Sequence, residues 1–382
     1  MRVLVVNAGS SSLKLTLLAS PRPRGCAQAG DGEDAAIATR ELAAPRAQVD
    51  PAALREALRG GLGEADAVGH RIVHGGERFR EAVRIDAGVE AQLRALVDLA
   101  PLHQPKSLAA LDAVSEALPG LPAVACFDTA FHATLPAAAA TYALPAQWRE
   151  RWGLRRYGFH GLSHAWVARR APQLLQRSAT GLRIVSCHLG AGASLCAIAD
   201  GRSLDTTMGF TPLEGLVMAT RSGSVDPGLL LWLLEHAQMS ARELADALEH
   251  SSGLLGLAGS ADMREILVRA QPDDRSAAGQ RARLALDTYV HRLRAGIAAM
   301  TAALGGIDAL VFTGGVGEHA AQVRARAAAG LGFLGVAIDD ASNAGAHGDA
   351  EIGADGATVR TLVVSAREDI EIARQVRTLL SG

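Results

Sequence analysis

Two short apolar runs, residues 184–187 and 195–199, enclose the sequence His-Leu-Gly-Ala-Gly-Ala-Ser at positions 188–194. A strand, a glycine-rich turn and a second strand predict a β-hairpin whose tip carries almost no side chains. Such a tip lets backbone N–H groups approach a bound group closely, and anions are their usual partners. Because glycine turns are common, a hairpin with a purely structural purpose explains this stretch alone equally well.

A second hairpin of the same kind is predicted at the start of the chain. The apolar run 4–6 leads into Asn7-Ala-Gly-Ser-Ser-Ser12, and residues 13–17 alternate as a strand does. The spacing of a P-loop is absent, and a strand follows the turn where a P-loop would have a helix. Asn7-x-Gly and His188-x-Gly each follow an apolar strand and lie about 180 residues apart. They predict a duplicated domain whose two hairpins close on one ligand.

The composition is that of a globular protein with no general affinity for nucleic acid. The 382 residues suffice for two domains, and a net charge of −2 leaves no basic surplus. An apolar start of only four residues is too short for a signal peptide, and no uncharged apolar segment is long enough to span a membrane. We therefore expect a cytoplasmic protein. The four cysteines show no CxxC spacing, which predicts buried free thiols without zinc or disulfides.

Predicted strands and helices alternate along the chain, which is typical of an α/β protein with two related halves. Further strands are expected at 36–42, 67–73, 122–127, 309–312 and 360–364. Helices are expected at 51–59, 89–99, 106–118, 163–175, 229–236, 241–249, 276–303 and 367–380. We place the first domain at residues 1–148, with the terminal helix 366–382 returning to it, and the second domain at 149–365.

A third glycine turn follows the strand 309–312. Thr313-Gly-Gly-Val-Gly-Glu318 opens a predicted helix, so that unpaired N–H groups and the helix dipole point toward a bound anion. Residues 252–259 form another glycine-rich connection, which leads to Asp262-Met-Arg264. Ser365-x-x-Glu368 fits a capping box, which by itself explains Glu368 as the start of the last helix.

Several charged and polar residues stand where an active site of an α/β protein is found. Asp128 follows a predicted strand and Arg71 lies near the end of another, although solvated surface charge is an alternative for both. His160 lies between glycines before a helix, where a packed core histidine is the alternative. Arg221 is placed in a loop, where its guanidinium could bind an anion with two hydrogen bonds.

These features together favour phosphoryl transfer. That chemistry needs positioning, positive charge around the transferring group and a divalent ion, all of which glycine turns, arginines, Lys14 and acidic residues can supply. A nucleophile elbow with a Ser-His-Asp order, a metal-cluster spacing and a dinucleotide fingerprint are all absent from the sequence. The residues alone therefore predict a nucleotide-dependent phosphotransferase.

Nine sequence blocks resemble the acetate kinase family in order and spacing, and they cover the chain from residue 3 to about 374. They are VVNAGSSSLK, GHRIVHGGE, LAPLHQP, FDTAFHATLP, YGFHGLSH, CHLGAGAS, TPLEGLVMATRSG, SGLLGLAGSADMR and FTGGVGE. The resemblance implies two related ribonuclease H-like domains with a central cleft, as in the acetate and sugar kinase, Hsp70 and actin superfamily. It also implies a homodimer.

Catalytic and metal-binding roles follow from the matched positions. The resemblance implies that Arg71 and Arg221 hold the acyl carboxylate and the transferring phosphoryl group, and that His160 donates to that group in the transition state. Asp128 matches an active-site position. We expect it to orient the arginines or the attacking oxygen, since an ionised carboxylate substrate needs no base. Asn7 and Glu368 match positions associated with Mg²⁺, for which Mn²⁺ is an alternative.

Binding residues follow in the same way. A small apolar pocket for the acyl methyl group matches Val73, Leu102, Phe159 and Pro212, next to Arg71. Val73 is larger than the alanine expected for a propionate enzyme, so acetate is expected first and propionate second. The nucleotide site matches Ser12, Lys14, His188, Leu189, Gly190, Ala191, Gly192, Asp262, Met263, Arg264, Gly314, Gly315, Val316, Gly317 and Glu318.

The implied reaction is the reversible, Mg²⁺-dependent and direct in-line transfer of a phosphoryl group from ATP to acetate, giving acetyl phosphate and ADP. A propionate or butyrate kinase and a nucleotide-binding homologue without turnover are the alternatives. The family usually has asparagine where this chain has Ala191, His319 and Arg367, and an acid where it has Ser224. Because Ala191 removes a side-chain hydrogen bond at the phosphate hairpin, we expect weaker nucleotide binding with the chemistry retained.

Overall fold

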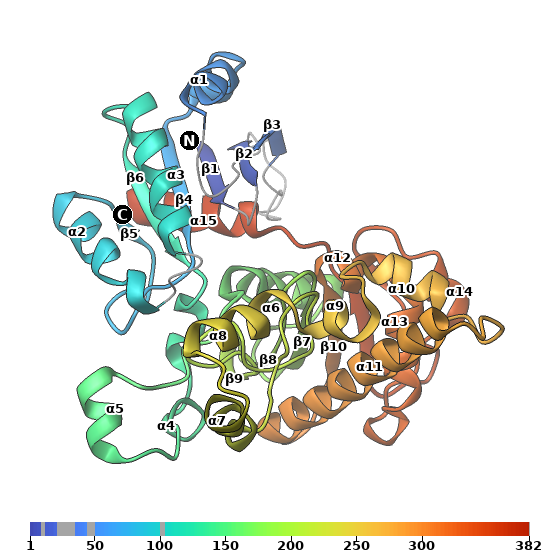
Figure 1. The fold of residues 1–382 in the computed structure, drawn as a ribbon. Coiled ribbons are helices and arrows are strands. Elements are labelled where there is room, and N and C mark those ends of the chain that lie inside the picture. The colour runs from blue at the N-terminus through green and yellow to red at the C-terminus, as the bar shows by residue number, and fades with distance from the viewer. Residues whose placement is uncertain (9–11, 21–34, 44–49, 100–103, 382) are drawn as a thin grey trace. The chain divides into compact units, whose positions relative to one another are not determined.

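The computed structural model of the chain describes residues 1–8, 12–20, 35–43, 50–99 and 104–381. The chain forms two compact units, each built on one six-stranded mixed sheet (Figure 1). The first unit comprises Met1–Ala133, Gly161–Trp166 and Arg367–Gly382, and the second comprises Thr134–His160 and Val167–Ala366. The predicted α/β fold with two related halves is confirmed. The predicted boundary at residue 148 stays a prediction.

The sheet of the first unit has the order β3-β2-β1-β4-β6-β5. Its strands are β1 (Arg2–Ala8), β2 (Ser12–Ala19), β3 (Ala35–Ala43), β4 (Ala67–Ile72), β5 (Val83–Arg84) and β6 (Ala123–Phe127). Strands β1, β2 and β3 are antiparallel neighbours, whereas β1, β4 and β6 run parallel. The predicted hairpin at the start of the chain is confirmed, with Asn7 opposite Lys14. Its turn residues 9–11 lie outside the described residues.

Helices cover both faces of this sheet. On one face α1 (Pro51–Arg59) and α3 (Gln104–Ala117) bury a cluster that includes Leu4, Leu54 and Val114. On the other face α15 (Glu368–Ser381) packs Ile372 and Val376 against the strands. A Cβ on Gly69 would lie 2.6 Å from the Ile372 side chain, so a glycine in β4 lets α15 approach the sheet closely. Helix α2 (Ala87–Ala95) completes the unit.

The second sheet repeats the connectivity of the first, with the order β11-β12-β10-β7-β8-β9. Its strands are β7 (Arg183–Leu189), β8 (Ala193–Ala199), β9 (Arg202–Thr206), β10 (Ala309–Thr313), β11 (Ala350–Glu351) and β12 (Arg360–Val363). Strands β7, β8 and β9 are antiparallel, and β7, β10 and β12 are parallel, as β1, β4 and β6 are. This shared order is the duplication that the two glycine hairpins predicted.

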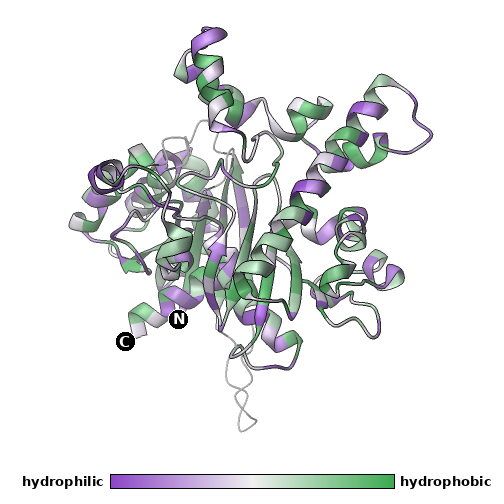
Figure 2. Cartoon of the chain, turned by 90° about the horizontal axis from the view of Figure 1, so that it is seen from below, coloured by the Kyte–Doolittle hydropathy of each residue, from purple (hydrophilic) through white to green (hydrophobic). Residues whose placement is uncertain are grey.

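Helices also pack on the second sheet, and hydrophobic residues concentrate along the strands that they cover (Figure 2). The longest, α11 (Ala277–Leu304), is capped by Ser276 at its start and lies against β8. The other helices of this unit are α4 (Ala137–Ala140), α5 (Ala146–Trp152), α6 (Gly161–Leu174, shared with the first unit), α7 (Pro227–His236), α8 (Ala241–His250), α9 (Gly253–Ala258), α10 (Met263–Arg269), α12 (Gly314–His319), α13 (Ala321–Ala329) and α14 (Asp340–Ala344).

Two local predictions were wrong. The glycine-rich segment 252–259 contains a short helix, α9. The helix predicted at 89–99 ends at Ala95, and Val97–Leu99 forms a separate 3₁₀ turn. The last helix, α15, begins at Glu368, whose carboxylate faces Asn7 and Arg71, and the capping box with Ser365 stays a prediction.

The predictions about cysteines and about membrane spans can be compared with the described residues. Cys126, Cys187 and Cys196 are buried thiols, as predicted, and Cys26 lies outside the described residues. Among the helices that the structure describes, none combines the length and the apolar character that a membrane crossing requires.

Candidate active site

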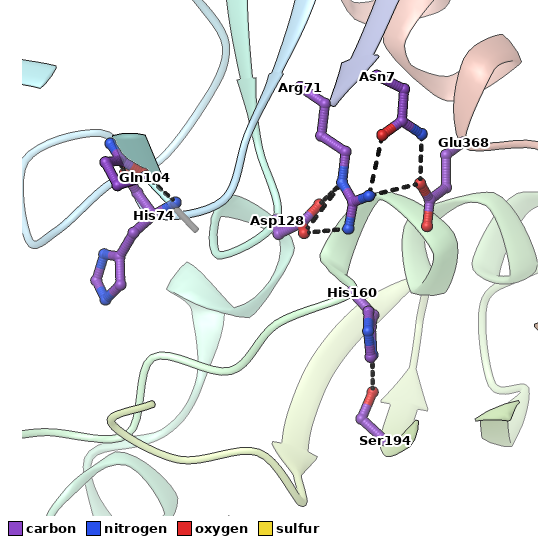
Figure 3. Close-up of polar contacts among 8 residues, drawn as sticks. All are labelled: Asn7, Arg71, His74, Gln104, Asp128, His160, Ser194 and Glu368. Carbon is purple, nitrogen blue, oxygen red and sulfur yellow. Dashed lines mark hydrogen bonds and ion pairs between the residues drawn. The ribbon is translucent and has the colours of Figure 1, made fainter. Parts of the chain in front are cut away.

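The first unit gathers four polar side chains at one edge of its sheet (Figure 3). Asn7 lies near the end of β1, Arg71 near the end of β4, and Asp128 directly after β6. Because these three strands are parallel neighbours, their carboxyl ends meet at the same edge. Glu368, the first residue of α15, completes the group.

Arg71 is held by contacts from three sides. Its Nε donates to both carboxylate oxygens of Asp128 at 3.0 and 3.2 Å, and its NH2 donates to Asp128 Oδ2 at 2.6 Å. NH1 donates to Asn7 Oδ1 at 3.1 Å and lies 3.6 Å from Glu368 Oε2. Asn7 Nδ2 in turn donates to Glu368 at 3.3 Å. The guanidinium plane is therefore fixed.

The charges of this cluster are nearly enclosed, since the Asp128 side chain is only 2% exposed. Burial alone would lower the pKa of Arg71, but the charges of Asp128 and Glu368 and the hydrogen bonds to Asp128 raise it above its ordinary value. Burial raises the pKa of Asp128, and the Arg71 guanidinium opposes this effect. Two carboxylates beside one guanidinium give the cluster a net negative charge, which favours binding of a further positive charge.

The oxygen donors of this cluster fit a magnesium ion. Mg²⁺ is usually bound by one or two carboxylates together with waters and substrate phosphates. Asn7 Nδ2 faces the Glu368 carboxylate, whereas Asn7 Oδ1 accepts from Arg71 NH1, so the amide oxygen would have to leave the guanidinium to bind an ion. Among the described residues, no group of three or more His, Cys, Asp or Glu side chains gathers in a metal-binding arrangement.

In the second unit His160 is held on two sides. It occupies the left-handed region (φ 57°) at the start of α6. Its ring stacks on His188, with centroids 4.3 Å apart, and its Nδ1 lies 2.9 Å from Ser194 Oγ. A Cβ on Gly192 would lie 3.2 Å from His160 Nε2 and 3.6 Å from Arg221 NH1. The bare tip of the central hairpin therefore lies beside both the imidazole and the guanidinium.

Arg221 is anchored through two different nitrogens. NH1 donates to the Pro212 carbonyl at 3.0 Å, and Nε lies 3.2 Å from a carboxylate oxygen of Glu249. Burial lowers the pKa of Arg221, and the Glu249 charge opposes that effect. A buried guanidinium with one compensating carboxylate is suited to binding an anion.

Two glycine turns of the predicted nucleotide site adjoin one another. The tip of the central hairpin is shorter than predicted, because His188 and Leu189 belong to β7 and only residues 190–192 form the turn. Gly314, at φ 78°, approaches the same strand: a Cβ there would lie 2.8 Å from the Leu189 carbonyl. Both turns therefore present backbone N–H groups at the end of β7.

The other predicted nucleotide residues make contacts within their own units. Asp262 caps α10 and pairs with Arg264 at 2.6 Å, and no hydrogen bond or ion pair among the described residues joins this pair to the turns. Met263 is buried. Glu318 accepts from the backbone N–H of Ala366 at 3.0 Å. Ser12 and Lys14 lie on β2 of the first unit.

The residues of the predicted acyl pocket belong to both units. Val73 follows β4 in the first unit, whereas Phe159 and Pro212 belong to the second, and Leu102 lies outside the described residues. Val73 and Phe159 are both buried. The pocket as a whole stays a prediction.

Two residues that contact this site were missed from the sequence. Ser194 lies in the motif of the central hairpin, and a search for a partner of His160 would have found it. Glu249 is the penultimate residue of α8 and lies 28 positions after Arg221 (249 − 221), and nothing in the local sequence pattern indicates a role for it.

Known proteins resemble this chain over its whole length. The family model described as the acetokinase family matches residues 2–374. A protein named acetate kinase from Gloeobacter violaceus is 47% identical over 98% of each chain. The crystal structure of Porphyromonas gingivalis acetate kinase has a TM-score of 0.86 at 37% identity, covering 99% of each chain. A propionate kinase from Francisella tularensis has a TM-score of 0.85 at 33% identity, covering 98% of each chain. The chain therefore belongs to the acetokinase family and is a kinase.

Proposed function

We propose that this kinase transfers the γ-phosphoryl group of ATP to acetate, reversibly, giving acetyl phosphate and ADP. The observation that carries the proposal is the placement of His160 and Arg221 beside the bare Gly192 turn. A guanidinium, an imidazole and exposed backbone donors at one point suit the charge of a transferring phosphoryl group. Acetate is proposed as the phosphoryl acceptor because similar proteins are named acetate kinase.

Arg71 is the proposed anchor for the carboxylate of acetate. A guanidinium has five N–H donors, of which the hydrogen bonds to Asp128 and Asn7 use Nε–H, one of NH2 and one of NH1. The remaining two can hold a substrate carboxylate. Asp128 and Glu368 then act by orienting Arg71, because acetate is already ionised at neutral pH and needs no general base.

The transfer itself needs no proton. A carboxylate oxygen of acetate forms a bond to the γ-phosphorus while the bond from that phosphorus to the bridging oxygen breaks, and the electron pair leaves with ADP. Arg221 and His160 bind the equatorial oxygens as the charge spreads over them. An arginine in this role is worth a factor of about 10³–10⁵ in rate.

Magnesium is the proposed cofactor, with manganese as the alternative, and Asn7 and Glu368 are the residues that would hold it. When bound, the ion would neutralise charge on the nucleotide phosphates. Removing it with a chelator should abolish turnover.

Acetate is the proposed first substrate, because Val73, Leu102, Phe159 and Pro212 match a pocket for one methyl group. Propionate is the second candidate, and it is favoured by the similarity to the solved propionate kinase. Butyrate kinase and a nucleotide-binding homologue without turnover remain as alternatives.

The deciding experiment is a coupled assay for ADP release with acetate, propionate and butyrate, each with and without Mg²⁺. Turnover should be highest with acetate and should fall by a factor of about 10³ or more, to a low but measurable rate, in Arg221→Ala. ATP binding without turnover on any acid would instead favour the homologue without catalysis.

The protein is further proposed to be a cytoplasmic homodimer. Helix α7 supports this assembly: six of its ten residues are leucine or tryptophan, yet none of the ten is buried, and Leu231 and Trp232 are 60% and 53% exposed. A nearly uncharged apolar helix suits a two-fold contact with its own copy.

A further inference from the structure

Glu249 forms an ion pair with Arg221, and the proposed reaction assigns no role to this carboxylate. Its Oε2 lies 3.2 Å from Arg221 Nε, and the two side chains are 13% and 20% exposed. Glu249 is the penultimate residue of α8, so its position is set by the helix.

The backbone around Arg221 is fixed independently of this carboxylate. Ser222 N donates to Leu248 O at 3.1 Å, and Ser252 N donates to Thr220 O at 2.9 Å. Leu254 N donates to Met218 O at 2.9 Å. Thr220 Oγ1 also donates to the backbone carbonyl of Glu249 at 2.8 Å. The loop that carries Arg221 is thereby held between the end of α8 and the start of α9 by contacts that do not involve the Glu249 carboxylate.

Gly253 makes this close packing possible. It has φ 60°, and a Cβ there would lie 2.2 Å from Met218 O and 2.6 Å from Arg221 O. Gly253, the first residue of α9, thus lets this helix pack closely against the loop that carries Arg221. What the backbone leaves undetermined is the direction of the long Arg221 side chain, which has several rotatable bonds.

We infer that Glu249 is a positioning residue for Arg221, whose carboxylate holds Nε while the Pro212 carbonyl holds NH1. Two contacts on different nitrogens fix both the plane and the direction of the guanidinium beside Gly192. Glu249 acts through Arg221 and touches no substrate. The inference deepens the proposed function and rests on it for the identity of the anion that Arg221 binds.

The test is a double-mutant cycle on the full-length protein. Glu249→Ala should lower kcat about 10-fold, with the KM for ADP changed less than about twofold, because ground-state nucleotide contacts are unaffected. Glu249→Gln keeps an oxygen acceptor and should recover most of the loss. In the Arg221→Ala background Glu249→Ala should cause no further loss, since a residue that acts only through Arg221 has nothing left to position.

Asp246→Ala is the matched control, because Asp246 is an exposed acid on the same helix. It should leave kcat unchanged. A purely structural role for Glu249 predicts instead the same fractional loss with and without Arg221, together with lowered thermal stability. That result, or wild-type kcat in Glu249→Ala, would overturn the inference.

A second readout separates this inference from the proposed function. The ¹H–¹⁵N signal of Arg221 Nε–H, identified by its loss in Arg221→Lys, should shift in Glu249→Ala and stay unchanged in Asp246→Ala. If the wild-type protein turns over none of the three acids, the proposed function fails, and this signal still decides whether Glu249 holds Arg221. An unshifted signal would contradict the positioning role whatever the reaction is.

Discussion

Arg71 and Asp128 form a two-pronged ion pair, in which Nε and NH2 of the guanidinium lie 3.0 and 2.6 Å from the two carboxylate oxygens. Such a pair holds the arginine plane in one orientation. Because both side chains are mostly enclosed, losing either one leaves a charge buried without its main partner.

Replacing Asp128 by alanine should therefore damage both catalysis and stability. We expect kcat to fall by about 100-fold, because a misplaced positioning group costs about that much. The free energy of unfolding should fall by about 3 kcal/mol. Asp112→Ala is the control, since Asp112 also pairs with an arginine but is exposed, and its loss should cost less than about 1 kcal/mol. Wild-type kcat in Asp128→Ala would show that another group orients Arg71.

Restoring an asparagine at position 191 should strengthen nucleotide binding. Ala191 is exposed at the tip of the central hairpin, and an added side-chain amide can donate one hydrogen bond to a phosphate oxygen, worth about 1 kcal/mol. We expect Ala191→Asn to lower the KM for ATP about fivefold with kcat unchanged. An unaltered KM in steady-state kinetics would refute the expected cost of alanine at this position.

Gly192 should tolerate no side chain. A Cβ there would lie 3.2 Å from His160, closer than a relaxed contact allows, so His160 must turn away from the turn. We expect Gly192→Ala to lower kcat about 10-fold with little change in melting temperature. Gly332→Ala is the control, because a Cβ at Gly332 meets nothing within 4 Å. Equal activities of the two variants would argue against a role for His160 beside the turn.

The stability of the first unit should fall in acid because of His70. This histidine is 1% exposed, neither ring nitrogen has a hydrogen-bond partner among the described residues, and burial lowers its pKa to about 4. The unfolded chain takes up the proton first, so the contribution of His70 is present above about pH 6.5 and is lost as the pH falls to about 4. The loss is on the order of 3 kcal/mol.

Urea unfolding at pH 7, 5.5 and 4.5 measures this dependence. His70→Leu should reduce the pH dependence of the free energy of unfolding by about half. The other half remains because burial also lowers the pKa of His74 to about 4. At pH 7 the leucine variant should be as stable as the wild type, since no hydrogen bond among the described residues is lost. A variant with an unchanged pH dependence would assign the acid sensitivity to other groups.

Disrupting α7 should give monomers if this helix forms the dimer contact. Trp232→Glu places a charge in the middle of an exposed apolar helix, which is costly to bury across a two-fold interface. Light scattering after size exclusion should report half the wild-type mass. Phe333→Glu changes an even more exposed apolar residue elsewhere and should leave the mass unchanged. A dimeric Trp232→Glu protein would place the contact on another surface.

Local patterns predicted most of the elements because hydrophobic periodicity and caps act over a few residues. Asp50-Pro51 marked the start of α1 correctly, and its carboxylate accepts from Ala52 N. The glycine hairpins located β1–β2 and β7–β8, and their likeness predicted the repeated sheet.

Long-range contacts could not be predicted in this way. Glu368 looked like a capping residue, yet its carboxylate bonds Asn7 across 361 positions. No local sequence pattern predicted the role of Glu249, because its pairing with Arg221 depends on how α8 packs on the loop that carries Arg221. The gathering of Asn7, Arg71, Asp128 and Glu368 depended on sheet order, which no single segment encodes.

The return of α15 to the first sheet determines the order in which the protein can be completed during synthesis. The ribosome makes β1 to β6 before the whole second unit, but the helix that covers one face of their sheet comes only at residues 368–381. Until then Val3, Val5 and the bare surface of Gly69 face water, since Ile372 and Val376 do not yet exist. The first sheet therefore cannot complete its packing until α15 has been synthesised. Until then its exposed apolar face is prone to aggregation, which chaperones counteract.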